Sequence, residues 1–231
     1  MKAAGTLAWI MVLSGCICAP LPAQVIHHAD FRSWTEYSGD PKSHFYYPHL
    51  LERFLSDDST LTDDELALLS HGYSCTPDYH PYGQSLTEDS LYTFNRSKDF
   101  ASTLRAGERY LRTNPVSLRA HFAMVVALRN LGRPDEFHRY QSRMFQLLRA
   151  VTSTGSGGST DSAMAVINAS DEYLILGYLG FTSGSQSLLT GPGGRSYDKL
   201  DAVSRNDPQT KKEFYFDITR PMNSLAREYE K

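Results

Sequence analysis

Two hydrophobic patterns follow one another along the chain, and they change near residues 151–162. In residues 100–111 and 134–151, apolar side chains recur every three or four positions, as on one face of a helix. In residues 212–219, large apolar side chains alternate with polar ones, as in a strand with one buried face. The patterns therefore predict an α+β fold in which antiparallel helices precede a small antiparallel β-sheet.

Five helices are predicted in the first part of the chain, at residues 45–55, 62–72, 100–111, 116–131 and 134–151. Thr62 and Glu65 have the spacing of a capping box, in which each side chain accepts a hydrogen bond from the backbone N–H of the other residue. Asn114 is expected to cap the helix that follows it. Residues 25–43 and 73–91 lack a helical period, so they are expected to form surface loops.

The last two predicted helices form a helical hairpin over residues 118–151, with Gly132 at the turn. The short connection implies antiparallel packing. The hairpin resembles one tetratricopeptide-type unit, because its length of about 34 residues fits that repeat. An ordinary helical hairpin is the favoured interpretation, because no second copy is recognisable in the sequence and such units are normally found in arrays.

Four strands and a terminal helix are predicted in the second part, with the strands at residues 163–168, 185–189, 196–205 and 212–219 and the helix at 221–229. The Gly/Ser-rich residues 154–160 could present backbone amides to a phosphate group, but they lack the Lys-Ser/Thr ending of a P-loop. A flexible connector is therefore the favoured interpretation. Asp171 and Glu172 are expected to cap the short apolar segment that they open.

The first 23 residues have the organisation of a secretory signal peptide. Lys2 provides a basic start, residues 7–17 are apolar, and Ala23 ends a cleavage region of small residues. The apolar run is shorter than the about 20 residues that a membrane-spanning helix needs. Cleavage after Ala23 is favoured; in the alternative, residues 13–16 act as a lipobox and Cys16 is lipidated. We therefore expect an exported protein of the periplasm or cell envelope, either soluble or lipid-anchored.

Composition favours one domain over residues 24–231. The chain has 231 residues, of which 41% are hydrophobic, and this is enough for one sizeable core. Residues 45–151 are expected to be its helical part and residues 162–219 its mainly strand part. The net charge of −3, with both signs interspersed, gives no electrostatic reason to bind nucleic acid. Membrane contact is expected only through the alternative lipid anchor.

Residues with catalytic or metal-binding side chains do not form a recognisable set. His71, Cys75 and His80 are close in sequence, but no companion pair completes the four ligands of a structural zinc site. The sequence has no G-x-S-x-G motif and no cysteine in a catalytic context. We therefore predict no catalytic residue, no metal site and no cofactor, and we expect Cys75 to be a buried or free thiol.

Aromatic side chains and an acidic pair indicate where a ligand could bind. The candidate ligand-binding residues are His71, Tyr73, Tyr79, Tyr82, Glu172 and Tyr173. Such residues can line a groove, although they more often fill the core and its rim. A hydrolase with its site between residues 71–82 and 171–173 is the alternative. A deep cleft joining these segments would favour the hydrolase, whereas a shallow groove on the helices would favour a binding protein.

Several stretches together resemble one protein family. Besides the export signal, they are FYYPHLLERFLSDDSTLTDDELALLSHGYSCTPDYHPYG (45–83), AMAVINASDEYLILGYLG (163–180) and FYFDIT (214–219). Over residues 46–219 the chain resembles the family of the domain of unknown function 4919 (DUF4919), found in exported proteins of Bacteroidota. The resemblance implies export and a single domain. In the family a tyrosine is common where His71 stands, which speaks against a histidine-based mechanism.

The resemblance implies no activity and no catalytic residue. The helical hairpin and the absence of a recognisable catalytic set favour a non-catalytic binding or interaction protein. Its partner is expected to be another envelope protein or a small ligand.

Overall fold

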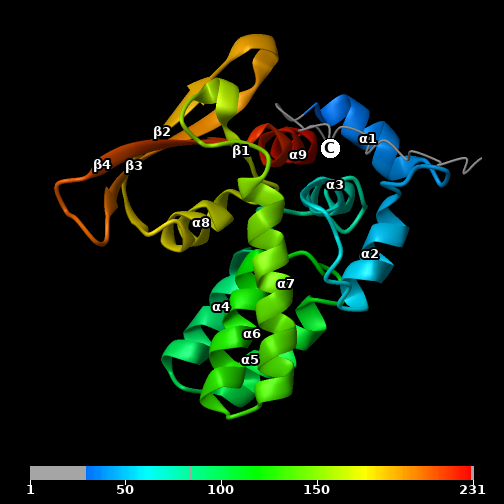
Figure 1. Cartoon of the computed structure of the whole chain (residues 1–231), viewed down its shortest axis with the longest axis vertical. Helices are drawn as coiled ribbons and strands as arrows, with labels where there is room; N and C mark the ends of the chain where they lie inside the picture. Colours follow the sequence, from blue (N-terminus) through cyan, green and yellow to red (C-terminus); the bar gives the residue numbers. More distant parts are fainter. Residues whose placement is uncertain (1–29, 84, 230–231) are drawn as a thin grey trace, which may run out of the picture.

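Helices form the first part of the chain and strands the last part in the computed structural model, which describes residues 30–83 and 85–229 (Figure 1). The helices are α1 (Phe31–Gly39), α2 (Tyr47–Leu55), α3 (Asp63–Tyr73), α4 (Ser85–Arg96), α5 (Phe100–Tyr110), α6 (Leu118–Asn130), α7 (Pro134–Thr152), α8 (Glu172–Tyr178) and α9 (Thr219–Tyr229). The strands are β1 (Met164–Ala165), β2 (Phe181–Thr190), β3 (Ser196–Ser204) and β4 (Lys211–Asp217). The predicted α+β class is confirmed. The predicted signal peptide and Cys16 lie outside the described residues.

Two helices occupy segments that were predicted to be loops. In α1, Asp30 caps the helix by accepting hydrogen bonds from the backbone of Arg32 and Ser33, and Trp34 is buried. In α4, the core-facing positions include the fully buried Leu91 and also the fully buried Glu88. A carboxylate at a core position hides the helical period, so the hydrophobic pattern alone does not predict α4. None of the described helices is both long and apolar enough to cross a membrane.

The start of α6 also differs from the prediction. Its cap is Ser117, whose hydroxyl accepts a hydrogen bond from the Ala120 N–H at 3.0 Å, so Asn114 is not the cap. The Asn114 side chain instead donates to the Tyr110 hydroxyl at 2.9 Å. The helix therefore begins at Leu118, two residues later than predicted.

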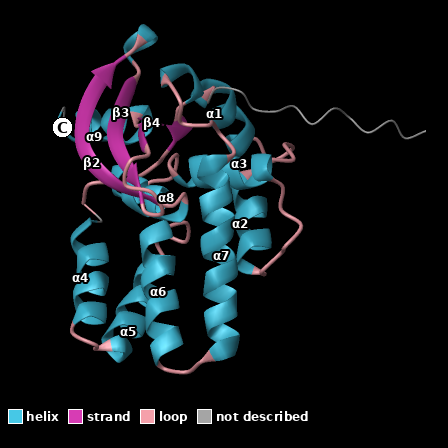
Figure 2. Cartoon of the chain, turned by 60° about the vertical axis from the view of Figure 1, so that its left-hand side comes forward, coloured by secondary structure: helices cyan, strands magenta, loops and turns pink. Residues whose placement is uncertain are grey.

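Helices α4 to α7 form two consecutive hairpins whose helices begin at matching intervals. Helices α4 and α6 begin 33 residues apart (85 and 118), and α5 and α7 begin 34 residues apart (100 and 134). Helix α6 packs against both helices of the first hairpin and against α7. Figure 2 shows the four helices side by side. The spacing matches that of tetratricopeptide repeats. The predicted hairpin therefore has a second copy, although the two sequences do not reveal it.

The sheet is mixed, with strand order β1-β4-β3-β2. The pairs β2–β3 and β3–β4 are antiparallel as predicted, but the two-residue β1 is parallel to β4, with Met164 opposite Phe216. Strand β4 shows the predicted alternation through Phe214, Phe216 and Ile218, which are all buried. Asp217 was predicted to face solvent but is also buried. Its carboxylate pairs with Arg195, which compensates for the loss of water.

The Gly/Ser-rich segment is packed against the sheet and is not a flexible connector. Gly157 donates its N–H to the Ser162 carbonyl at 2.7 Å and accepts the Tyr215 N–H at 2.9 Å. Its φ of +70° is strained for other residues, and an added Cβ would meet the Met164 methyl carbon at 2.7 Å. The positive φ therefore favours glycine at this position, whereas the Met164 methyl group, at the end of a flexible side chain, could shift to make room for a Cβ.

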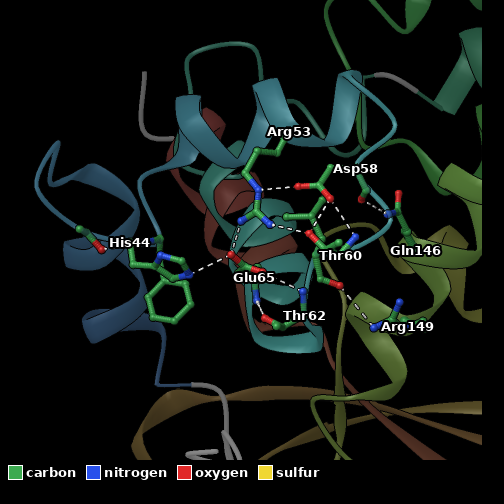
Figure 3. A network of polar contacts seen from close by, with 11 residues as sticks. His44, Arg53, Asp58, Thr60, Thr62, Glu65, Gln146 and Arg149 are labelled. Atoms are coloured by element: carbon green, nitrogen blue, oxygen red, sulfur yellow. Dashed lines mark hydrogen bonds and ion pairs between the residues drawn. The ribbon is translucent and has the colours of Figure 1, made fainter. Parts of the chain in front are cut away.

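A polar network joins α2, α3 and α7 beside the main core (Figure 3). Both hydrogen bonds of the predicted capping box are present, since Thr62 accepts from Glu65 and Glu65 accepts from Thr62. The buried Glu65 carboxylate also pairs with the Arg53 guanidinium and with His44 Nε2 at 2.8 Å. Glu65, which takes part in the capping box of α3, thus also connects this helix to Arg53 of α2.

Candidate functional site

The six candidate ligand-binding residues lie in three separate places. His71 is buried under α1, whereas Tyr73 and Tyr79 pack between α3 and the segment before α8. The other three, Tyr82, Glu172 and Tyr173, lie near the junction of α8 and the sheet. The structure therefore brings part of residues 71–82 next to residues 171–173, but it does not gather all six side chains into one site.

His71 has the environment of a core residue. Its ring stacks on Phe31 at 5.6 Å and meets the edge of Trp34 at 5.4 Å. Its Nε2 lies 3.1 Å from the Thr35 hydroxyl. Burial, together with the positive charge of Arg220, lowers the pKa of His71 to about 3, so its imidazole is neutral at physiological pH. These contacts do not place His71 in a position to exchange protons with solvent.

Tyr73 and Tyr79 hold the two segments together. Their rings meet edge to face at 5.9 Å, and both are buried. Tyr79 donates its hydroxyl to the Ile167 carbonyl at 2.5 Å, and Tyr73 donates to the Asp78 carbonyl at 3.1 Å. With the hydroxyls used in these hydrogen bonds, both tyrosines act as packing residues.

A buried pair of carboxyl groups lies where α8 meets the sheet. Glu172 is fully buried, and neither of its oxygens forms a hydrogen bond of normal geometry. Burial raises its pKa to about 9, with a further contribution from the nearby Asp198 carboxyl. Asp198 is 5% exposed, and burial raises its pKa as well. Glu172 is therefore protonated and neutral at pH 7.

The carboxyl pair is connected to the surface through two polar side chains. Asp198 accepts a hydrogen bond from Gln186 Nε2 at 2.7 Å, and Gln186 Oε1 accepts one from the Tyr173 hydroxyl at 2.8 Å. Tyr82 donates its hydroxyl to Met222 Sδ at 3.4 Å, and partial burial, with contributions from Asp198 and Glu172, raises its pKa. Sequence reasoning missed Asp198 and Gln186. Asp198 could have been found from its position in β3. It lies two residues before Leu200, and side chains two positions apart in a strand lie on the same face, here the buried one.

The expected capping role of Asp171 and Glu172 is not found. Asp171 stands before α8, but its side chain accepts no capping hydrogen bond, and its Oδ1 has no hydrogen-bond partner. The preceding turn is instead capped by Asn168, which accepts from the Ser170 N–H at 3.1 Å. Burial and the nearby Glu88 raise the pKa of Asp171 well above its usual value, while Arg119 acts in the opposite direction.

The cavities described between the two candidate segments are narrow. One, of about 20 Å³, is lined by His71 and Asp171 among others. The second, of about 10 Å³, lies between Tyr79 and Asp171. Each has room for about one water molecule, not for a substrate. Over residues 30–83 and 85–229, no group of three or more His, Cys, Asp or Glu side chains is placed to hold a metal ion.

A larger apolar groove lies between α6, α7 and α8, and we call it the α8 groove. Its volume is about 270 Å³. It is lined by Leu118, Phe122, Met144, Leu148, Tyr173, Leu174, Gly177, Tyr178 and Arg205. Tyr173 and Tyr178 are 51% and 52% exposed, so they extend the apolar surface from the groove to solvent. Of the predicted site residues, Tyr173 lines this groove.

One cationic side chain lies at the edge of the α8 groove. Arg205 follows β3, and its backbone N–H donates to the Gly180 carbonyl at 2.9 Å. A Cβ on Gly177 would lie 3.1 Å from Arg205 Nη2, so the small residue leaves space for the guanidinium against α8. Arg205 has no carboxylate partner within the part of the chain that the structure describes. An apolar groove with one unpaired positive charge favours a ligand that is apolar and carries an acidic group.

Residues 35–227 match the model of one protein family, described as "Domain of unknown function (DUF4919)". No curated protein and no solved structure matches the chain. The matched range includes the α8 groove and the buried carboxyl pair.

Proposed function

Because the chain belongs to the DUF4919 family, whose description states no function, we propose a function from the structure. The protein is a non-catalytic binding protein of the cell envelope, and its α8 groove holds an apolar segment of a partner protein that carries a carboxylate. The observation that carries the proposal is the exposed apolar groove on the helices with Arg205 at its edge.

The composition of the groove supports a protein partner. Protein interfaces are enriched in tyrosine, phenylalanine, methionine and arginine, and the groove is lined by all four types. Phe145, next to the groove residue Met144, is 42% exposed, and its ring lies 6.2 Å from that of Tyr178. The apolar surface therefore continues beyond the groove, as expected for a contact with an extended partner.

The hydrolase alternative has less support. A protonated carboxyl beside a second carboxyl is an arrangement that general acid catalysis can use. Glu172 and Asp198 are, however, 0% and 5% exposed, and the two cavities that touch both residues 71–82 and Asp171 each have room for about one water molecule. The geometry of these residues favours binding over hydrolysis.

Peptide selection tests the binding proposal. Short peptides selected from a random displayed library against the full chain are expected to combine apolar residues with aspartate or glutamate. In calorimetric titrations, Met144→Glu should weaken their binding by about tenfold or more, because it places a charge in the apolar groove. Arg205→Glu should weaken the binding of acidic peptides by a similar factor. It should strengthen the binding of peptides in which lysine replaces the acidic residue.

The control variant is Arg105→Glu, since Arg105 is exposed on α5, away from the groove. It should bind the selected peptides like the wild-type chain, and both arginine variants should unfold at temperatures similar to that of the wild-type chain. Selected peptides without acidic residues, or equal affinity for the wild-type chain and Met144→Glu, would contradict the proposal.

Location in the envelope is a separate part of the proposal, and it is supported by the basic, apolar and small-residue regions of residues 1–23. The intact mass of the mature chain tests it. We expect a chain that begins at Gln24. A mass that corresponds to an acylated Cys16 would support the lipid-anchored alternative, and a full-length mass would contradict export.

A further inference from the structure

A second hollow, lined by different residues from those of the α8 groove, lies where the end of α3 meets α1 and α9. Its volume is about 400 Å³. Figure 1 shows α9 next to α3, and Arg220 of α9 donates to the Ser74 carbonyl at 3.2 Å. Hydroxyl, imidazole, thiol and guanidinium groups contribute to the lining of this hollow, and none of its lining residues is acidic.

Two arginines give the hollow a positive charge in a chain whose net charge is −3. Arg220 donates from Nε to the Ser74 hydroxyl at 2.9 Å and from Nη2 to Cys75 Sγ at 2.7 Å. Arg227 donates from Nε to the Asn223 carbonyl of its own helix at 3.2 Å. Neither guanidinium pairs with a carboxylate among the residues described. Within the described part of the chain, the positive charge of the hollow is therefore not balanced by a carboxylate of its lining.

A buried hydroxyl lies between these two arginines. Arg220, Ser224 and Arg227 are spaced four and three residues apart on α9, so all three side chains lie on one face of the helix. Ser224 is 7% exposed and lines the hollow. Its hydroxyl can therefore donate a hydrogen bond to a ligand that occupies the hollow.

We propose that this hollow binds a small organic molecule through an anionic phosphate or carboxylate group, which Arg220, Arg227 and Ser224 hold together. The planar guanidinium matches both oxyanions, and charge-assisted hydrogen bonds to it are about twice as strong as neutral ones. The site is separate from the α8 groove and does not depend on the partner protein proposed for that groove.

Cys75 provides a direct probe of the hollow, because it lines the hollow and is an exposed free cysteine. The full chain is treated with iodoacetamide, a neutral reagent, and alkylation of the Cys75 peptide is followed by mass spectrometry. Inorganic phosphate and succinate are the test anions, and sodium chloride of equal ionic strength is the reference. At least one test anion is expected to slow alkylation of Cys75 several-fold relative to chloride and to raise the unfolding temperature.

Two variants identify the groups that hold the anion. Arg227→Ala removes a guanidinium that donates a hydrogen bond within its own helix, so the fold should persist while the affinity falls by about tenfold. Ser224→Ala removes one hydroxyl group from the lining of the hollow, so it should weaken binding with little change in stability. Arg105→Ala is the matched control and should bind like the wild-type chain.

Protection by phosphate alone or by succinate alone identifies the chemical class, and both results support the site. The proposal is overturned if neither anion protects Cys75 more than chloride does, or if Arg227→Ala is protected at the same anion concentration as the wild-type chain.

Discussion

Glu65→Ala is expected to lower the free energy of unfolding by about 3 kcal/mol or more, because it removes one partner of a buried ion pair. The Glu65 carboxylate is 2% exposed and accepts from the Thr62 N–H at 2.8 Å, from His44 Nε2 at 2.8 Å and from Arg53. Without it, the Thr62 N–H loses its partner, and Arg53 retains its ion pair with Asp58 and its hydrogen bond to the Thr60 hydroxyl. Unfolding in urea, followed by circular dichroism, measures the difference.

Asp64→Ala is the matched control, because Asp64 also lies in the first turn of α3 but forms no ion pair among the described residues. It should change stability by less than about 1 kcal/mol. A loss after Glu65→Ala as small as that of the control would show that the network in Figure 3 contributes little.

The effect of Glu65→Ala also depends on pH. Burial acts to raise the pKa of Glu65, but the hydrogen bonds from Thr62 and Arg53 outweigh it, and the pKa is lower than its usual value. A carboxyl with a lowered pKa contributes stability above its unfolded pKa and loses it as the pH falls through the folded value. The difference between the wild-type chain and Glu65→Ala should therefore shrink below about pH 4.

Glu172→Gln is expected to stabilise the protein by about 1–3 kcal/mol at pH 8. Glu172 is fully buried with a pKa raised to about 9, so folding requires it to bind a proton that the unfolded chain releases above about pH 4.5. Glutamine has nearly the same shape, needs no proton, and can donate a hydrogen bond towards Asp198. Thermal unfolding at several pH values measures the gain.

The sign of this pH dependence is opposite to that of Glu65. Stability of the wild-type chain should fall as the pH rises from about 4.5 to 9, and Glu172→Gln should remove much of this slope. At pH 4 the variant and the wild-type chain should be nearly equally stable. Glu108→Gln, at an exposed position of α5, should leave the slope unchanged. A Glu172→Gln variant with no gain at pH 8 would mean that Glu172 is solvated or ionised in the folded chain.

The elements that were predicted correctly are those whose signals are local. The capping box of Thr62 and Glu65 places α3, and the Pro134 start and regular apolar spacing place α7. The alternation in β4 likewise identifies its buried face. In each case the residues that decide the structure are neighbours in sequence, so a pattern over a few positions is sufficient.

The elements and site residues that were missed depend on contacts between distant parts of the chain. The buried Glu88 of α4 is acceptable in the core because Tyr110, Ser117 and Arg119 donate to it, and these residues belong to α5 and α6 or adjoin them. Asp198 meets Glu172 only once β3 has packed against α8. Arg205 reaches the α8 groove because the chain turns after β3. No local pattern contains this information.

The position of β2 at the end of the strand order has a consequence for self-association. Within the described residues, β2 has β3 as its only strand neighbour, so its other edge carries unpaired backbone groups. An uninterrupted edge of this kind is a template for a strand from another molecule. The pairing of β2 with β3 shifts between Ser183 and Gln186, which is the signature of a bulge. Because a bulge increases the local twist and breaks the row of backbone groups, it protects this ten-residue strand against fibril-like growth.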